Sequence, residues 1–270
     1  MKTFFKVDDL ELTDERFFLI AGPCVIEDEG LTREIASEAG KTCAELGIPF
    51  IFKASFDKAN RSSIRSPRGP GIEKGLPVLE KIKAELHIPV LSDIHEPWQA
   101  EAAARVLSII QIPAFLSRQT DLLLAAARTG LPLNIKKSQM MSPADIVLAV
   151  NKAAEAGNRR VMLTERGSFF GYNNLVVDFR SIPRMKESGC PVVMDATHAV
   201  QRPSGAGPVS GGDPQFIPML AAAGIVAGAD GIFLEIHPRP EKALSDGTNS
   251  LPLRELRPLL IRLQKLYNVR

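Results

Sequence analysis

Residues 51–63 (IFKASFDKANRSS) join the end of a short apolar run to a series of polar groups. The polar residues that follow the run are Lys53, Asp57, Lys58, Asn60, Arg61, Ser62 and Ser63. Arginine presents a flat fork of donors that suits phosphate or carboxylate oxygens, and lysine presents a mobile point charge. Open α/β sheets and barrels bind their ligands where strands end. This stretch therefore predicts a site for an anionic small molecule, with a solvated surface loop as the alternative.

A second group of residues has the chemistry of metal ligands. Its members follow the first, seventh and eighth apolar runs of the chain: Cys24, His198, Glu235 and Asp246. A thiolate, an imidazole and two carboxylates suit a divalent transition metal such as Zn, Fe or Mn. No CxxC or HExxH spacing supports the set, and Cys24 alone would more often be a small buried hydrophobe. The set gains weight only if the first and last strands are neighbours.

A third group is cationic. It comprises Lys53, Lys58, Arg61, Lys136, Lys137 and Arg166. Several cations at one place repel each other unless a multiply charged ligand neutralises them, so two phosphate-bearing substrates would fit. Lys136 or Lys137 could instead form a Schiff base, which is a rival chemistry. The glycine-rich segment 204–212 has little apolar content and is predicted to be a mobile lid over the site.

The elements that must position these groups alternate regularly along the chain. Short apolar runs, typical of buried strands, begin near Phe17, Phe50, Pro89, Ser108, Leu131, Arg160, Pro191 and Gly231. Helix-like segments lie between and after them at 30–46, 73–87, 97–106, 119–129, 142–156, 174–188, 214–227 and 252–268. Eight strands alternating with eight helices predict an α/β fold, a closed (β/α)8 TIM barrel, with a doubly wound open sheet as the alternative.

The predicted domain organisation is simple. Residues 1–16 are expected to form a short N-terminal extension, with a hairpin of Thr3–Val7 and Glu11–Thr13, and residues 17–270 a single barrel domain. Every predicted strand ends in chemically capable groups, among them Cys24, Lys53, Asp93, His95, Gln111, Lys136, Gln139, Arg166, Asp195, His198, Glu235 and His237. In a barrel these ends converge on one face, where active sites are built.

Composition excludes several classes of partner and compartment. Apolar residues make up 45% of the 270 and charged residues 24%, as in an ordinary globular protein. A net charge of +2 without basic blocks does not favour nucleic acid as a partner. Three cysteines form no disulfide framework and suit a reducing compartment. The apolar run 17–26 follows an acidic segment and is too short to span a bilayer, so we expect a cytoplasmic protein without a membrane partner.

Long motifs over nearly the whole chain resemble one enzyme family. They are IAGPCVIE, FKASFDKANRSS, SPRGPG, LSDIHE, QIPAFLSRQTDLL, NIKKSQ, TERGSFFGYNNLVVDFR, MDATHAVQ and LEIHPRPEKALSDG. They are similar to those of 3-deoxy-D-manno-octulosonate-8-phosphate (KDO8P) synthase. The resemblance implies a (β/α)8 barrel transferase that condenses phosphoenolpyruvate, D-arabinose 5-phosphate and water into the octulosonate phosphate and inorganic phosphate, for lipopolysaccharide biosynthesis. It also implies a cytoplasmic homotetramer.

The nearest alternative is 3-deoxy-D-arabino-heptulosonate-7-phosphate synthase, which uses erythrose 4-phosphate. The segment KANRSS (58–63) favours the octulosonate enzyme, because the heptulosonate enzymes typically have a K-P-R-T-S type segment there. Members of the octulosonate family that work without metal have Asn in place of Cys24. The resemblance therefore implies the metal-dependent class, with Zn, Fe, Mn, Co or Cd held by Cys24, His198, Glu235 and Asp246.

The resemblance also assigns roles to the remaining residues. Phosphoenolpyruvate is expected to contact Lys53, Lys58, Lys136, Gln139 and Arg166, and the pentose phosphate Asn60, Arg61 and Ser62. Gln111 is a further expected substrate contact, and Arg118 is expected to reach the site of a neighbouring subunit. The expected catalytic residues are Cys24, Lys53, Asp93, His95, His198 and Asp246. A Schiff-base aldolase and a non-catalytic phosphosugar-binding barrel are the rival functions.

Overall fold

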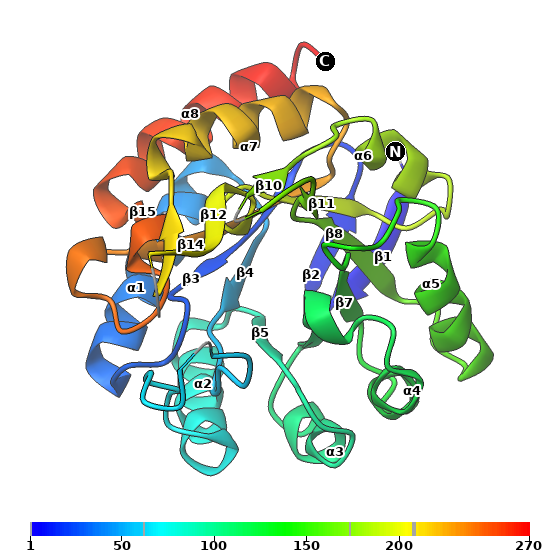
Figure 1. Cartoon of the computed structure of the whole chain (residues 1–270), viewed down its shortest axis with the longest axis horizontal. Helices are drawn as coiled ribbons and strands as arrows, with labels where there is room; N and C mark the ends of the chain where they lie inside the picture. The colour runs from blue at the N-terminus through cyan, green and yellow to red at the C-terminus, as the bar shows by residue number, and fades with distance from the viewer. Residues whose placement is uncertain (1, 62, 173, 207–208) are drawn as a thin grey trace.

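In the computed structural model, eight parallel strands form a closed barrel (Figure 1). The structure describes the backbone of residues 2–61, 63–172, 174–206 and 209–270, and the side chains of these residues except 203–206, 209 and 210. The barrel strands are β3 (Phe18–Gly22), β4 (Phe50–Lys53), β5 (Val90–Asp93), β6 (Ile109–Ile112), β7 (Leu133–Lys136), β8 (Val161–Glu165), β11 (Val192–Asp195) and β14 (Gly231–His237). Because β14 pairs with both β11 and β3, the ring is closed, as the sequence predicted, and the open sheet is excluded.

Helices surround the barrel (Figure 1). They are α1 (Glu29–Leu46), α2 (Ile72–Leu86), α3 (Gln99–Ala104), α4 (Thr120–Arg128), α5 (Ile146–Glu155), α6 (Ser181–Lys186), α7 (Ile217–Val226) and α8 (Leu253–Tyr267). The larger apolar core lies between these helices and the outer faces of the strands, which are buried on both sides. Such strands read as continuous apolar runs, and this is why the sequence revealed them.

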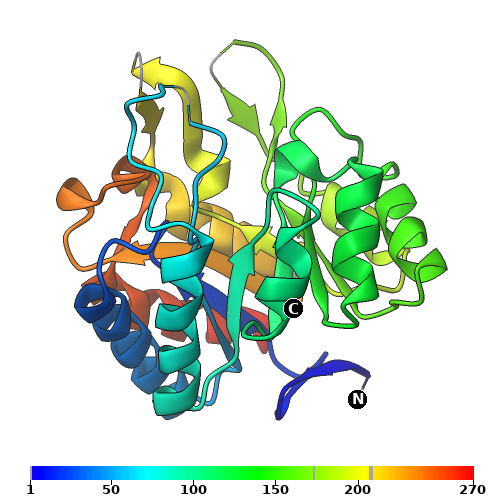
Figure 2. The same ribbon diagram turned by 90° about the horizontal axis from the view of Figure 1, so that it is seen from below.

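A second apolar cluster fills the lower half of the barrel interior. The strands contribute Phe18, Ile20, Ile51, Leu91, Ile109, Met162, Val193 and Phe233. The hairpin of β1 (Thr3–Val7) and β2 (Leu10–Thr13) adds Val7 and Leu12, which are buried against them. Figure 2 places this hairpin (dark blue) at one end of the barrel, opposite the long loops. The expected hairpin is therefore present, and the division of the chain into 1–16 and 17–270 stays a prediction.

Several loops at the opposite end carry their own short strands (Figure 2). These are β9 (Ser168–Phe169), β10 (Leu175–Val176), β12 (Gln201–Ala206), β13 (Val209–Gly212) and β15 (Leu251–Pro252). The segment predicted as a lid, 204–212, forms most of the β12–β13 hairpin where it is described; residues 207 and 208 lie outside the described residues, and motion of the segment stays a prediction.

Two predicted helix boundaries are wrong. The helix expected over 174–188 is shorter, because Leu175 and Val176 pair with β9 as a strand and α6 begins only at Ser181. The helix expected from Ser142 begins at Ile146, after a turn. In both places the chain first builds a loop around the barrel mouth. Among the described residues, no helix has the length and apolar character needed to cross a bilayer.

Candidate active site

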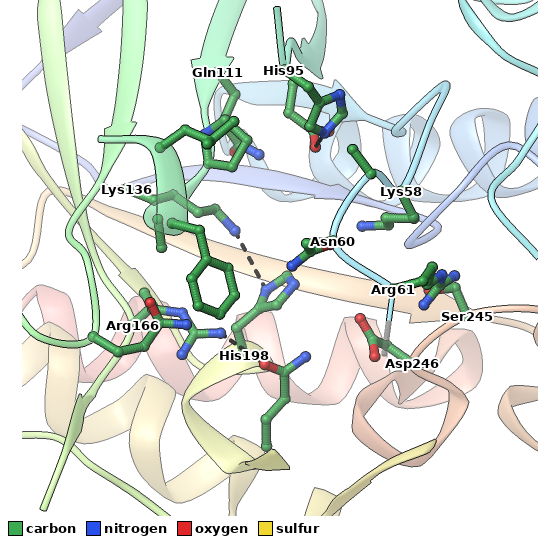
Figure 3. Close-up of a pocket in the computed structure, with 18 of the residues that line it drawn as sticks. Lys58, Asn60, Arg61, His95, Gln111, Lys136, Arg166, His198, Ser245 and Asp246 are labelled. Atoms are coloured by element: carbon green, nitrogen blue, oxygen red, sulfur yellow. Dashed lines mark hydrogen bonds and ion pairs between the residues drawn. The ribbon is translucent and has the colours of Figure 1, made fainter. Parts of the chain in front are cut away.

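A cavity of about 630 Å³ lies at the carboxyl ends of the barrel strands (Figure 3). Twelve of the residues predicted to form the site line it: Lys53, Lys58, Asn60, Arg61, Asp93, His95, Gln111, Lys136, Gln139, Arg166, His198 and Asp246. They come from seven of the eight barrel strands or from the loops that follow them. Their convergence is a consequence of barrel closure, because the chain positions themselves are far apart.

Several charged or titratable side chains at the base of this cavity lie close to Glu235 on β14. Its side chain is 1% exposed, and its Oε1 lies 3.3 Å from Lys53 Nζ, 3.8 Å from Lys58 Nζ and 3.3 Å from His198 Nε2. Burial alone would raise the pKa of Glu235, but the surrounding positive charges outweigh it and lower the pKa to about 2. Glu235 is therefore an ionised carboxylate. Its second oxygen, Oε2, is buried without a hydrogen bond.

Asp195 at the end of β11 joins two site residues to each other. Its Oδ2 accepts hydrogen bonds from Lys136 Nζ and His198 Nδ1, both at 2.7 Å, and its Oδ1 accepts the His198 backbone N–H at 2.8 Å. Burial opposes ionisation, yet His198 and Lys136 hold the pKa of Asp195 well below its usual range. Lys136 Nζ also lies 3.7 Å from the centre of the Phe233 ring. These contacts fix Lys136 and His198 relative to one another.

Arg166 and Gln139 form one wall of the cavity. Arg166 is 4% exposed, and its Nη2 donates to the neutral Gln201 Oε1 at 2.7 Å. Within the part of the chain that the structure describes, Arg166 makes no ion pair, its Nη1 has no partner, and Gln139 Oε1 has none either. Burial lowers the pKa of Arg166, against nearby carboxylates that raise it. A buried guanidinium with unused donors is a ready anion site.

His95 and Asp93 form a pair on another wall. His95 Nε2 lies 3.1 Å from Asp93 Oδ2, and Ser55 Oγ donates to Asp93 Oδ1 at 2.5 Å. The His95 bond and charge outweigh burial, so the pKa of Asp93 is held well below its usual range. His95 Nδ1 is buried without a partner. On the neighbouring strand Gln111 lines the cavity, where its Oε1 accepts from Asn134 at 3.1 Å.

The loop after β4 lines the side of the cavity away from Lys136 and Arg166 (Figure 3). Arg61 Nε donates to Pro67 O at 2.8 Å, and its Nη2 is buried without a partner. Asn60 is exposed at the rim. Ser62, predicted to bind the same ligand, lies outside the described residues. Arg118 is exposed and does not line this cavity, so its reach into a neighbouring subunit stays a prediction.

The four residues expected to hold a metal meet beside the cavity. Cys24 Sγ and carboxylate oxygens of Glu235 and Asp246 all lie within 4.8 Å of one another, and His198 reaches this set through Glu235. Cys24 Sγ lies 2.8 Å from Ser245 Oγ and donates to Asp246 Oδ2 at 3.3 Å. Burial and then Glu235 raise the pKa of the Cys24 thiol well above its usual range. The sulfur, imidazole and carboxylate donors, with Glu235 Oε2 unpaired, fit a divalent transition metal.

Some functional residues were missed or misread from the sequence. Lys137 was grouped with the cations of the mouth, but it is 1% exposed and does not line the cavity. Strand alternation explains this, because Lys136 points into the barrel and its neighbour points away. Gln201 and Ser245, which contact Arg166 and Cys24, were not singled out. Both lie in the motifs MDATHAVQ and LEIHPRPEKALSDG, and this was the only signal for them.

A closed (β/α)8 barrel with buried cations around a cavity at the carboxyl ends of its strands defines the class: barrel enzymes that act on anionic small molecules. The chain belongs to the DAHP synthetase I family, since a sequence model of that family matches residues 7–269. The match covers the barrel and all twelve cavity-lining residues predicted from the sequence.

The curated relatives are more specific. A 2-dehydro-3-deoxyphosphooctonate aldolase of Desulfotalea psychrophila is 55% identical over 259 residues, which cover 96% of this chain and 92% of the relative. Proteins with the same name from Desulfosudis oleivorans (58% over 243 residues, 90% and 87%) and Koribacter versatilis (52% over 265 residues, 97% and 95%) are similarly close. That name is another name for the octulosonate-phosphate synthase predicted from the sequence, and it supports this prediction over the heptulosonate alternative.

Proposed function

We propose that this chain condenses phosphoenolpyruvate with D-arabinose 5-phosphate and water to give 3-deoxy-D-manno-octulosonate 8-phosphate and inorganic phosphate. The names of the full-length relatives support the enzyme class. The observation that carries the chemistry is Arg166, a buried guanidinium whose one described partner is the neutral Gln201. A buried guanidinium with an unused donor and no ion pair among the described residues favours an anionic ligand at this wall.

Phosphoenolpyruvate fits the side of the cavity formed by Lys136, Gln139 and Arg166. The Arg166 fork and the Lys136 ammonium suit its phosphate and carboxylate oxygens. Lys53 at the end of β4 and Lys58 on the loop after it both lie against Glu235. The pentose phosphate then fits the loop side, where Arg61 has an unused donor. The two substrates thus meet end to end over Glu235 and His198.

The reaction makes a carbon–carbon bond and breaks a carbon–oxygen bond. C3 of phosphoenolpyruvate attacks the aldehyde carbon of the pentose, and a proton must reach the new hydroxyl oxygen. Water adds at C2, loses a proton, and the resulting intermediate expels inorganic phosphate. Lys136 and Arg166 stabilise the negative charge that accumulates on the departing phosphate, and the fixed cavity supplies orientation. The pair of Asp93 with His95 is placed to move protons.

We further propose that the enzyme is of the metal-dependent class, with a divalent ion held by Cys24, His198, Glu235 and Asp246. Such an ion would supply Lewis acidity toward an aldehyde oxygen or a water molecule. The chain orients its own ligands for this purpose. Because Asp195 accepts the Nδ1 proton of His198, the Nε2 lone pair is free on the side of Glu235. The zinc, iron, manganese, cobalt and cadmium ions are all compatible with this donor set.

We also propose that the protein is a cytoplasmic homotetramer, because its motifs resemble those of the octulosonate-phosphate synthase family. In that assembly Arg118, which is exposed and outside its own cavity, would contact the pentose phosphate of a neighbouring subunit. Sedimentation of the wild type gives the oligomeric state. Arg118→Ala is then expected to raise the KM of arabinose 5-phosphate and leave that of phosphoenolpyruvate unchanged.

The deciding experiment measures phosphate release from phosphoenolpyruvate with arabinose 5-phosphate or erythrose 4-phosphate as the acceptor. Strong preference for arabinose 5-phosphate is expected, and comparable turnover with erythrose 4-phosphate would refute the assignment. A third arm adds borohydride with substrate, because Lys136 lies in the cavity. Covalent trapping on Lys136 would favour the Schiff-base chemistry, whereas its ion pair with Asp195 leads us to expect none.

A further inference from the structure

A buried ion pair lies behind the wall that carries Gln139 and Arg166. Lys137 follows β7 directly, Glu165 is the last residue of β8, and each residue is 1% exposed. Lys137 Nζ lies 3.6 Å from Glu165 Oε1. Neither side chain lines the cavity. The pair therefore touches no substrate, yet it is adjacent in sequence to the residues of the proposed anion site.

The remaining hydrogen bonds of the Lys137 ammonium group go to loops of the barrel mouth. Its Nζ donates to the backbone oxygens of Ser138 (3.3 Å) and Met141 (3.2 Å), which flank Gln139, and to Ser168 Oγ (2.9 Å) on β9. The backbone N–H of Phe169 donates to Gln139 O at 3.0 Å, so the same two loops are also joined through their backbones. One ammonium group thus determines how the loop with Gln139 sits against β9.

Glu165 holds the backbone turn that carries Arg166. Its Oε1 accepts the backbone N–H groups of Arg166 (3.0 Å) and Gly167 (2.7 Å), and its Oε2 accepts Ser181 Oγ (2.6 Å) at the start of α6. Gly167 has φ +88°, a conformation that favours glycine, so the turn reverses sharply just after Arg166. A carboxylate that binds the N–H groups of this turn fixes the direction in which the Arg166 side chain leaves the backbone.

A purely structural pair would not need these contacts. Burial penalises the Lys137 charge and lowers its pKa, against the Glu165 charge that raises it. Two apolar side chains would fill the space without this penalty. What apolar side chains cannot do is bind backbone oxygens of one loop and backbone N–H groups of the next. The Lys137–Glu165 pair therefore fixes the position of the loop with Gln139 relative to the turn that follows Arg166.

We propose that Lys137 and Glu165 are positioning residues that hold Gln139 and Arg166 at the spacing required by the anion of phosphoenolpyruvate. The identity of that anion rests on the proposed function, whereas the geometry does not. Arg61 lies on a different loop, after β4, with no described contact to this pair. Loss of the pair should thus weaken binding of phosphoenolpyruvate and leave binding of the pentose phosphate unchanged.

The test uses the double variant Lys137→Met/Glu165→Gln in the full-length protein. Removing both charges avoids leaving one of them buried alone, which would unfold the loops for an unrelated reason. The dissociation constant of phosphoenolpyruvate is measured by calorimetry, and KM of each substrate by phosphate release. We expect the affinity for phosphoenolpyruvate to fall by roughly 10- to 50-fold, because its charged contacts are no longer held in place. The KM of the pentose phosphate should be unchanged.

A matched control is the ion pair of Lys186 and Asp230, with Nζ to Oδ1 at 2.7 Å, at the opposite end of the strands. Lys186→Met/Asp230→Asn is expected to lower the thermal midpoint without changing the affinity for phosphoenolpyruvate. If the Lys137/Glu165 variant binds phosphoenolpyruvate as the wild type does, or if both substrates are weakened equally, the positioning role is wrong.

Two further arms keep the outcome unambiguous. If the double variant does not fold, Ser168→Ala removes only the 2.9 Å contact to Lys137 Nζ, and a smaller weakening in the same direction is expected; an unchanged affinity would count against the proposal. If the wild type does not bind phosphoenolpyruvate, the proposed function fails. Binding of inorganic phosphate is then compared between the wild type and the variant, and equal affinities would overturn the positioning role by itself.

Discussion

The two ends of the barrel interior differ in chemistry although the same strands build both. At the end closed by the β1–β2 hairpin, the inward-facing residues are apolar, and at the mouth they are charged or polar. On five of the eight strands the change occurs within two residues: Ile51 to Lys53, Leu91 to Asp93, Ile109 to Gln111, Val193 to Asp195, and Phe233 to Glu235. Two residues correspond to about 7 Å of strand.

The apolar end of the barrel offsets the free-energy cost of burying charged side chains at the mouth. Because the lower layer and the outer core supply apolar burial, the mouth can hold Glu235, Asp195 and their cationic partners, which contribute little to net stability. We therefore expect changes at the mouth to alter activity with little effect on folding, and changes at the closed end to do the reverse. Substitutions at the two ends, and removal of the metal, can test this separation of activity from stability.

Removal of metal should abolish activity and leave the protein folded. EDTA or dipicolinate is expected to stop phosphate release, with recovery on adding a divalent transition metal, while the protein stays folded at the assay temperature. Cys24→Ser should lose most bound metal, because a hydroxyl is a poor ligand for soft ions. Cys24→Asn places the residue of the metal-independent relatives there, so some chelator-resistant turnover is expected. Fully active wild type that elemental analysis finds free of metal would contradict this prediction.

Truncation at the closed end should affect stability alone. Leu12 is fully buried in the lower cluster, and Leu12→Ala should lower the free energy of unfolding by about 2–5 kcal/mol. KM values of the folded variant should match the wild type. Leu10→Ala is the control, since Leu10 is only partly buried and should cost less. Denaturant unfolding measures both, and an altered KM in Leu12→Ala would show that the two ends are coupled.

Arg166→Ala should affect binding without loss of stability. Loss of a partly desolvated charged contact is expected to weaken phosphoenolpyruvate binding by about 2–4 kcal/mol. The free energy of unfolding should change little, because burial of the guanidinium is unfavourable and it makes no ion pair among the described residues. Lys136→Ala differs, since it leaves the buried Asp195 carboxylate without its ion pair to lysine and should lower both affinity and stability. Unchanged saturation by phosphoenolpyruvate in both variants would show that this wall does not bind it.

The smallest effect is expected for an exposed ion pair. Glu101 and Arg105 lie one turn apart on and just after α3, with side chains 83% and 75% exposed. Glu101→Ala should cost no more than about 0.5 kcal/mol of unfolding free energy and leave turnover unchanged. Denaturant unfolding measures this loss, with Arg105→Ala measured beside it. A larger loss would show that exposed ion pairs on the outer helices contribute substantially to stability, contrary to this prediction.

The sequence predicted the barrel because its strands are buried on both faces and therefore stand out as apolar runs. All eight predicted strands are present, as is the convergence of Lys53, Lys136 and His198 on one cavity. The helix over 174–188 failed for a local reason: the pairing of Leu175 with Phe169 depends on a loop contact that no periodicity records.

The site was predicted in its composition but not in its internal contacts. No pattern indicated that Asp195 would bind Lys136 and His198 together, because that contact depends on the spacing of three strands around the ring. The direction of Lys137 could have been predicted, since neighbours on a strand face opposite sides. Roles that require a ligand or a second subunit, such as those of Ser62 and Arg118, stay predictions.

The pairing of β3 with β14 has a consequence for synthesis on the ribosome. Gly231 pairs with Phe18, so the first barrel strand meets its second neighbour only after nearly the whole chain has emerged. Until then β3 presents an unpaired, fully apolar edge, which is a template for association with other chains. We therefore expect β3, near the N-terminus, to need a chaperone's protection for longer than any other strand during synthesis. A chain truncated before β14 should aggregate rather than fold.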